Sequence, residues 1–179
     1  SYFCSFDRFL DRFAGEGIPV IMVGNILEYG ARLLDVGIDT DMCGVLAAEI
    51  ASLIVPVDCS TAVFTGHPNI RVHQEKVEAF LREAERLNLN VTGVYATHDD
   101  PQYAEHLVRQ VTEDNRSARC IYVSTGNSSS ICRYLVANGL SGEIKVIATD
   151  INDATVAYMD EGVMRASIYQ VPYAQGRVA

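Results

Sequence analysis

The chain has 179 residues, of which 49% are hydrophobic and 21% charged, a composition typical of a globular domain with a sizeable core. Its net charge is −9, from 14 basic and 23 acidic residues, and a surface this acidic repels the phosphate backbone of nucleic acids. No apolar run approaches the roughly 18 residues that cross a bilayer, and no basic-then-apolar leader opens the sequence. We therefore expect no nucleic-acid or membrane contact from this segment.

The cysteines bear on the cellular compartment. Their number is odd and no two of them form a CxxC pair. This favours a reducing, cytoplasmic setting in which thiols serve as small apolar residues, over a disulfide framework. The five are Cys4, Cys43, Cys59, Cys120 and Cys132.

The first third of the chain shows two helices and two strands. Phenylalanines and a leucine over residues 3–13 recur at helical spacing, and Gly15 and Gly17 end that helix. Residues 18–23 (IPVIMV) form a continuous apolar run, as in buried parallel strands. Residues 33–38 form the next strand, and Asp39-Thr40-Asp41 caps a helix that runs to about Ile54.

Short apolar strands and amphipathic helices alternate over the remainder. Strands are expected at 61–65, 91–97, 120–123, 144–147 and 166–169, with helices after each of the first four. Two helices have clear buried stripes: Val77, Phe80, Leu81 and Ala84 on one, and Tyr103, Ala104, Leu107, Val108 and Val111 on the other. Strict alternation predicts an α/β fold, a doubly wound parallel sheet with helices on both faces.

Polar residues follow several of these strands. Asp150 comes directly after one apolar run, and Gln170 follows another. Because the carboxyl ends of parallel strands share one edge of a sheet, both groups are expected at a common ligand crevice. The alternative is that Asp150 caps the next helix and Gln170 lies in a solvated turn.

Five segments resemble one family. Two of them lie near the end of the chain, "KVIATD" and, about 12 residues later, "GVMRASIYQVPYAQGRVA". The other three are "EGIPVIMVGN", "VGIDTDMCGVLAAE" and "HQEKVEAF". Together they resemble the effector-binding domain of LacI/GalR-type transcription regulators and periplasmic sugar-binding proteins. The resemblance implies a periplasmic-binding-protein-like type I fold. Residues 1–25 would end an N-terminal lobe, 26–170 would form the C-terminal lobe, and 171–179 would return to the first lobe, so we expect a fragment.

The resemblance also implies a set of sugar contacts. Lys76 stands where the family has Arg, and Ala79 where it has Gly, so a point charge replaces a planar fork. The alternative for Lys76 is a solvated helix lysine paired with Glu75 or Glu78. The predicted ligand-binding residues are Asn25, Asp39, His73, Lys76, Ser124, Asn127, Asp150 and Gln170. The alternatives are that Asp39 caps its helix and that His73 lies at the surface, and the loop contact comes from either Ser124 or Asn127.

The resemblance predicts binding rather than catalysis. We expect an effector-sensing domain of a LacI-type regulator that binds a sugar between two lobes, as a homodimer whose DNA-binding helix-turn-helix is absent from this chain. One alternative is a periplasmic sugar receptor of a transporter. Another is an α/β enzyme that binds a phosphate at the loop "STGNSSS", which lacks the lysine and glycine spacing of nucleotide loops. No catalytic set, cofactor or metal site is predicted.

Overall fold

The computed structural model describes residues 6–24, 33–114 and 117–179. Contacts divide the chain into two compact units, one of residues 40–170 and the other of residues 1–39 with 171–179. Residues 33–39, which the sequence assigned to the larger lobe, thus fall in the smaller unit. Among the described residues, no helix combines the length and the apolar character that crossing a membrane requires.

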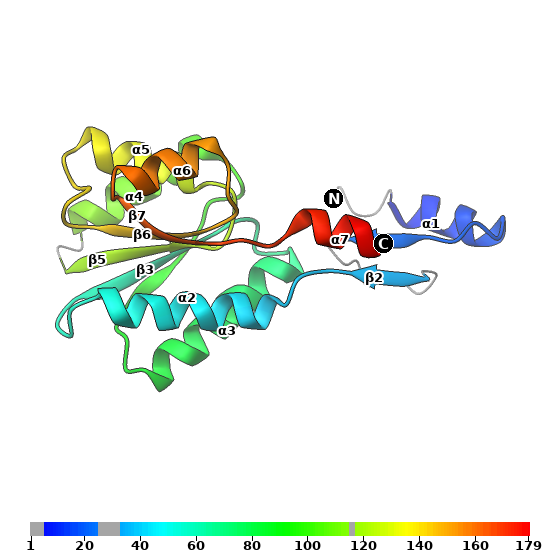
Figure 1. Ribbon diagram of the computed structural model, residues 1–179, viewed down its shortest axis with the longest axis horizontal. Coiled ribbons are helices and arrows are strands. Elements are labelled where there is room, and N and C mark those ends of the chain that lie inside the picture. The colour runs from blue at the N-terminus through cyan, green and yellow to red at the C-terminus, as the bar shows by residue number, and fades with distance from the viewer. Residues whose placement is uncertain (1–5, 25–32, 115–116) are drawn as a thin grey trace. The chain divides into compact units, whose positions relative to one another are not determined.

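The larger unit is built on five parallel strands in the order β4-β3-β5-β6-β7 (Figure 1). The strands are β3 (Ser60–Thr65), β4 (Val91–Ala96), β5 (Ala118–Val123), β6 (Lys145–Thr149) and β7 (Met164–Ile168). The chain passes from β3 to β4 on one side of β3, and then crosses back so that β5 lies on the other side of β3. This places the topological switch point between β3 and β5, where parallel sheets of this type open a ligand crevice.

Helices cover both faces of this sheet, which confirms the predicted doubly wound architecture. They are α2 (Thr40–Ile54), α3 (Arg71–Arg86), α4 (Pro101–Asp114), α5 (Ser128–Ala137) and α6 (Asp153–Asp160). Helices α2 and α3 lie on one side of the sheet, and α4, α5 and α6 on the other (Figure 1). Asp100 caps α4, because its Oδ1 accepts hydrogen bonds from the amides of Gln102 and Tyr103 at 2.8 and 3.0 Å.

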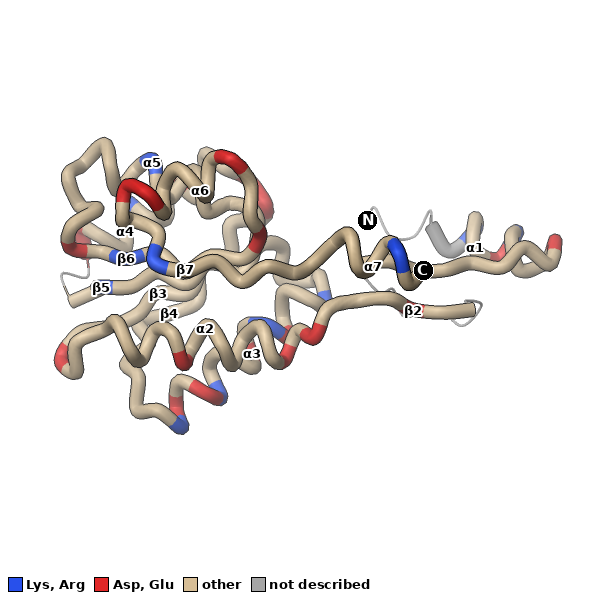
Figure 2. Tube along the Cα trace, in the orientation of Figure 1, with Lys and Arg blue, Asp and Glu red and all other residues tan. Residues whose placement is uncertain are grey.

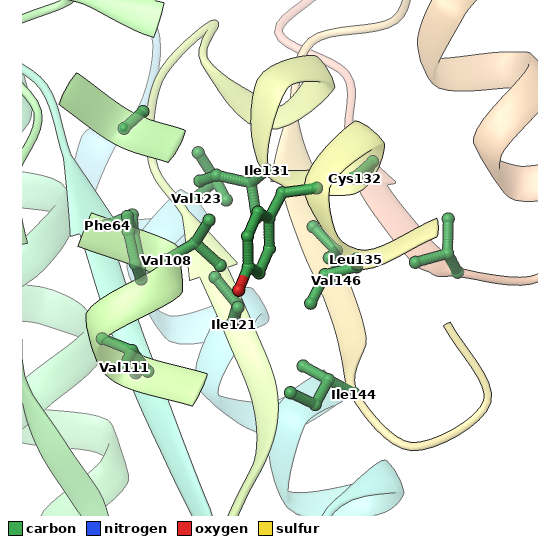
Figure 3. Packing of buried hydrophobic residues seen from close by; sticks show 14 of the residues in the cluster. Phe64, Val108, Val111, Ile121, Val123, Ile131, Cys132, Leu135, Ile144 and Val146 are labelled. Atoms are coloured by element: carbon green, nitrogen blue, oxygen red, sulfur yellow. The ribbon is translucent and has the colours of Figure 1, made fainter. Parts of the chain in front are cut away.

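Alternate residues of the strands supply two separate hydrophobic cores. Phe64, Ile121 and Val146 face α4 and α5, where they pack against residues such as Val108 and Leu135 (Figure 3). The opposite face carries Val63, Tyr122 and Ile147, which pack against the alanines of α2 and against Phe80 of α3. Burial on both faces explains why these strands read as continuous apolar runs.

Two residues of the predicted helix stripes are not buried. Leu81 of α3 is 37% exposed and Tyr103 of α4 is 43% exposed. Lys76 and Glu83 are buried on α3 instead. The apolar pattern alone could not give the exact orientation of α3, because α2 packs against it closely enough to cover polar positions.

The smaller unit contains α1 (Phe6–Gly15), β1 (Ile21–Val23), β2 (Leu34–Val36) and α7 (Pro172–Val178). Strands β1 and β2 pair in parallel. The prediction of a buried strand was wrong for β1, since Ile21 and Val23 are 37% and 48% exposed. Within the described residues β2 is the one strand paired with β1, so this small sheet lacks the cover that buries a parallel strand.

Charged residues are dispersed along the described chain. Figure 2 shows Lys and Arg as separate short segments, with Asp and Glu spread over helices and loops. Several charges form exposed ion pairs, such as Arg82 with Asp41 at 2.6 Å and Arg133 with Glu105 at 3.1 Å. Such pairs contribute little to stability, and the distribution offers no basic stripe for a polyanion.

Candidate ligand-binding site

The switch point between β3 and β5 is lined by hydroxyl groups. Ser124, directly after β5, donates from its Oγ to Thr65 Oγ1 at the end of β3, with 3.0 Å between the oxygens. Both residues are buried, at 0% and 6% exposure. The two central strands therefore end in a polar junction where the fold places ligand crevices.

Lys76 reaches this junction from the second turn of α3. Its side chain is 4% exposed, and its Nζ donates to the backbone oxygen of Ser124 and to Gln170 Oε1, both at 3.3 Å. The alternative of a solvated lysine paired with Glu75 or Glu78 is therefore wrong. Glu75 instead accepts from Thr40 Oγ1 at 2.6 Å.

Close packing of two helices explains why Lys76 is buried. A Cβ atom added at Gly44 of α2 would lie 2.4 Å from the carbonyl oxygen of Lys76 and 2.6 Å from Ala79 Cβ. Glycine at this position lets α2 approach α3 and cover the lysine stem. Burial lowers the pKa of Lys76 below its ordinary value, while the neighbouring Cys43 and Asp150 act in the opposite direction.

Asp150 and Gln170 complete a linked series. Gln170 Nε2 donates to Asp150 Oδ1 at 2.7 Å, and its Oε1 accepts from Lys76. Asp150 does not cap the next helix, because Asn152 does: its side chain accepts from Thr155 N at 3.0 Å in a capping box. The structure thus brings Lys76, Gln170 and Asp150 together, each from a different element, at the carboxyl edge of the sheet.

Asn127 belongs to a neighbouring polar group. Its Nδ2 donates to Thr97 Oγ1 at 3.0 Å, and Thr97 in turn donates to the carbonyl oxygen of Thr65 at 2.8 Å. Thr125 Oγ1 is buried and has no hydrogen-bond partner among the described residues. A buried hydroxyl without a partner is costly, so Thr125 is a position where a ligand or a water would complete the bonding.

His73 lies one turn before Lys76, near the end of β3. Its Nδ1 is 3.3 Å from the carbonyl oxygen of His67, and a Cβ at Gly66 would come within 2.5 Å of its ring and 2.3 Å of Asp99 Oδ1. Burial lowers the pKa of His73, with Asp99 opposing the shift. The His73 imidazole packs beside a glycine and a carboxylate and is partly enclosed, rather than free at the surface.

A shallow depression adjoins this histidine. It has a volume of about 220 Å³ and is lined by Thr65, Pro68, His73, Gln74, Val77, Glu78 and Val94. Neither Lys76 nor Asp150 belongs to its lining, so it is distinct from the linked series.

Two predicted site residues cannot be joined to this group. Asn25 lies outside the described residues. Asp39 is exposed and belongs to the smaller unit, whereas the other six predicted residues belong to the larger one. Both remain predictions.

Sequence reasoning missed the threonines of the crevice. Thr65 and Thr97 end predicted strands, and Thr125 lies in the loop that was singled out, so the strand-end rule applied to them too. Threonine is common in strands for packing reasons, so a threonine at a strand end gives little sign of a ligand site.

The arrangement suits reversible binding of a neutral polar molecule. Lys76 donates only, Asp150 accepts only, and carboxamides and hydroxyls do both. Within the series the opposite charges of Lys76 and Asp150 are bridged by the Gln170 carboxamide. Among the residues that the structure describes, no three histidine, cysteine or acidic side chains gather in a way that would hold a metal ion.

The doubly wound sheet with its polar strand ends defines an α/β binding domain. The chain belongs to the periplasmic binding protein domain family, whose model matches residues 5–179. A search of curated protein sequences finds no match.

Solved structures share the fold at low sequence identity. GanP, a glucose-galactose binding protein from Geobacillus stearothermophilus, is 17% identical with a TM-score of 0.86, over 97% of this chain and 62% of that one. An ABC transporter solute-binding protein from Agrobacterium vitis with bound D-fucose is 18% identical with a TM-score of 0.88, over 94% and 60%. A periplasmic ribose ABC transporter protein from Conexibacter woesei is 22% identical with a TM-score of 0.84, over 92% and 56%. The chain thus spans between 56% and 62% of these three.

Proposed function

We propose that the larger unit is the sugar-contacting lobe of a monosaccharide receptor that delivers its ligand to an ABC-type transporter. The observation that carries this proposal is the series Lys76–Gln170–Asp150 at the carboxyl edge of the sheet. Three side chains from separate elements meet there with complementary hydrogen-bonding capacity. A binding protein needs such a set, and a hydrolytic enzyme would need a nucleophile and base in contact instead.

The chemistry of a sugar fits the series. Each hydroxyl of a monosaccharide both donates and accepts, so neighbouring hydroxyls can accept from Lys76 and donate to Asp150. In the structure Gln170 fills these roles, since it accepts from Lys76 and donates to Asp150. A sugar would replace the Gln170 carboxamide as the partner of Lys76 and Asp150. Because these two side chains are already in position, little free energy is needed to organise the site.

The solved structures support a neutral pentose or hexose as the ligand class. Their titles name a glucose-galactose binding protein, a solute-binding protein with D-fucose and a carbohydrate transporter protein from Agrobacterium radiobacter in complex with D-arabinose. The two Agrobacterium proteins are solute-binding proteins of transporters, so they favour the receptor over the regulator that the sequence analysis placed first. The chain spans only part of the length of these proteins. We therefore propose that residues outside this chain also contact the sugar.

Titration calorimetry of the full-length protein tests this proposal. The panel contains D-glucose, D-galactose, D-ribose, D-fucose and D-arabinose, with D-galacturonate as the charged counterpart of galactose. At least one neutral sugar should bind with a dissociation constant in the micromolar range or below, and galacturonate should bind more weakly than galactose. Absence of heat with all five neutral sugars would contradict the proposal.

A LacI-type regulator is the second candidate, favoured by the thiols. Within the described ranges, none of Cys43, Cys59, Cys120 and Cys132 forms a disulfide bond. Burial raises the pKa of Cys120 and of Cys132 to about 12, so neither forms a reactive thiolate. Thiols outside disulfide bonds suit a cytoplasmic protein. In this reading the protein is a homodimer that carries DNA-binding heads. A helix-turn-helix in the full-length protein supports the regulator, and a cleaved leader supports the receptor.

The phosphate-binding enzyme has the least support. In the loop after β5, Ser124 Oγ is bonded to Thr65, Asn127 to Thr97, and Ser130 Oγ to the carbonyl oxygen of Asn127. These side chains hold the loop to neighbouring strands. Turnover of a phosphorylated substrate that is lost on changing Asn127 would restore the enzyme reading.

A further inference from the structure

The amine of Lys76 is buried next to neutral oxygens. The residue is 4% exposed, and its Nζ lies 3.3 Å from both Ser124 O and Gln170 Oε1. Neither acceptor is charged, whereas a carboxylate partner would lie about 2.7–2.9 Å away. Lys76 forms no ion pair with any residue in the described ranges. Burial without a paired charge disfavours the ammonium form of a lysine.

These surroundings make the amine of Lys76 a better nucleophile than that of an exposed lysine. Burial lowers the pKa of Lys76, and the opposing effects of Cys43 and Asp150 offset that shift only in part. A larger fraction of the amine is therefore unprotonated at neutral pH, with a lone pair that can attack a carbonyl carbon. Arginine, which the resembling family has at this position, stays protonated and cannot react in this way. The replacement of Arg by Lys thus adds a chemical property to the site.

The ligand class proposed for the site contains a carbonyl group. Glucose, galactose, ribose, fucose and arabinose are aldoses, and each ring opens reversibly to a chain that ends in an aldehyde. Gln170 is bonded to both Lys76 and Asp150, so the amine and the carboxylate lie within reach of one small molecule. Asp150 can accept from a sugar hydroxyl while the aldehyde meets Lys76. The site therefore has a nucleophile where the reactive end of an aldose can contact it.

We propose that Lys76 captures an aldehyde, in the proposed function the open-chain form of an aldose, as a covalent imine. The amine nitrogen attacks the aldehyde carbon, and a C–N bond forms. The carbonyl oxygen then leaves as water, with the two protons that the nitrogen gives up, and a C=N bond remains. No oxidant or reductant takes part, and water reverses the step, so the sugar is released intact. The identity of the sugar rests on the proposed function, whereas the reactivity of Lys76 is tested without it.

The first test needs no sugar. The full-length protein is treated near neutral pH with glycolaldehyde and sodium cyanoborohydride, which reduces an imine to a stable secondary amine, and its peptides are analysed by mass spectrometry. Lys145 is the internal comparison: it is half-buried, and its Nζ also donates to two carbonyl oxygens, at 2.7 and 3.1 Å. Lys76 should be labelled about tenfold faster than Lys145. Labelling of Lys76 at the same rate or more slowly would overturn the proposal.

The second test replaces glycolaldehyde by the panel sugar that the wild type binds best. The Lys76 peptide should gain the mass of that sugar less one oxygen atom. An excess of the anhydroalditol of the same sugar, whose ring cannot open to an aldehyde, should compete for the site and slow the labelling. Lys76→Arg keeps a cationic donor without a nucleophilic amine, so the adduct at position 76 should be lost while labelling of Lys145 stays unchanged.

Asp150→Ala separates recognition of the sugar from reactivity of the amine. Asp150 opposes the lowering of the pKa of Lys76, so this variant should react with glycolaldehyde at least as fast as the wild type. Its labelling by the sugar should fall about tenfold, because the carboxylate no longer accepts from a sugar hydroxyl. Loss of glycolaldehyde labelling in Asp150→Ala would show that burial does not set the reactivity, and would overturn the proposal.

The two proposals fail in different ways. A sugar that binds in calorimetry but leaves no adduct on Lys76 would overturn covalent capture, and the proposed receptor would stand. Fast labelling of Lys76 by glycolaldehyde, in a protein that binds none of the panel sugars, would contradict the proposed function and support capture of an aldehyde by Lys76.

Discussion

Replacing Lys76 by methionine tests the role of the buried ammonium group. Methionine keeps most of the length and apolar character of the lysine stem, so α2 and α3 retain their packing. The variant removes the donor to Ser124 O and to Gln170 Oε1. The sugar would lose its only cationic donor among the three linked side chains.

The expected effects on stability and on binding differ in size. Two hydrogen bonds are lost, each worth about 1 kcal/mol net. This loss is offset because the variant no longer has to bury a charged group. The cost of burying that charge is also what lowers the pKa of Lys76. The free energy of unfolding should therefore change by less than about 1 kcal/mol. A charge-assisted hydrogen bond to the sugar is worth about 1.5–3 kcal/mol, so the dissociation constant should rise about 10- to 150-fold.

Lys145, the other lysine of the chain, provides a matched control. It begins β6 at the opposite edge of the sheet, and its Nζ also donates to two carbonyl oxygens, those of Ser141 and Gly162, at 2.7 and 3.1 Å. Urea unfolding and sugar calorimetry on Lys76→Met and Lys145→Met give both quantities. Lys145→Met should leave the affinity within twofold of the wild type. An equally small change in affinity for Lys76→Met would refute the assigned role of Lys76.

Three further changes test other parts of the structure. Asp150→Ala should abolish measurable sugar binding in calorimetry with little loss of fold, and unchanged affinity would contradict its placement in the site. Gly44→Ala should lower the free energy of unfolding by about 1–3 kcal/mol, because its Cβ would meet the Lys76 carbonyl oxygen. Gly142→Ala, with open space around it, should be nearly neutral, and equal losses would argue against close helix packing. Hydrogen bonds from a threonine hydroxyl and an arginine lower the pKa of Glu75 below 4.5. The stability it adds is therefore present above pH 4.5 and lost as the pH falls through the lowered value. Glu75→Gln should remove that dependence from acid unfolding curves, and an unchanged acid limb would count against the interaction.

Most of the candidate site was predictable from one rule, that polar residues following parallel strands lie at the same edge of the sheet. Asp150 and Gln170 follow strands of one parallel sheet, so their common edge was predictable from the alternation of strands and helices. The strand order was not, because alternation does not say that β5 returns to the far side of β3. The contact between Thr65 and Ser124 depends on that order.

The features that lie beyond sequence reasoning are set by tertiary packing. Polarity favours a solvated Lys76, yet it is 4% exposed on a helix that α2 approaches closely at Gly44. A valine before a proline predicts an extended residue, yet Val171 is left-handed, and its carbonyl oxygen accepts from the amides of Ala174 and Gln175 in the first turn of α7. Aspartate is a common N-cap residue, but the N-cap of α6 is Asn152, two residues after Asp150.

A crystal structure of the full-length protein with the best-binding neutral sugar tests the central claim most directly. We predict one sugar hydroxyl within about 2.7–3.2 Å of Lys76 Nζ and another at the same distance from an Asp150 carboxylate oxygen. The Gln170 carboxamide should no longer bridge the two. A sugar bound elsewhere, with the bonds between Lys76, Gln170 and Asp150 intact, would contradict the account.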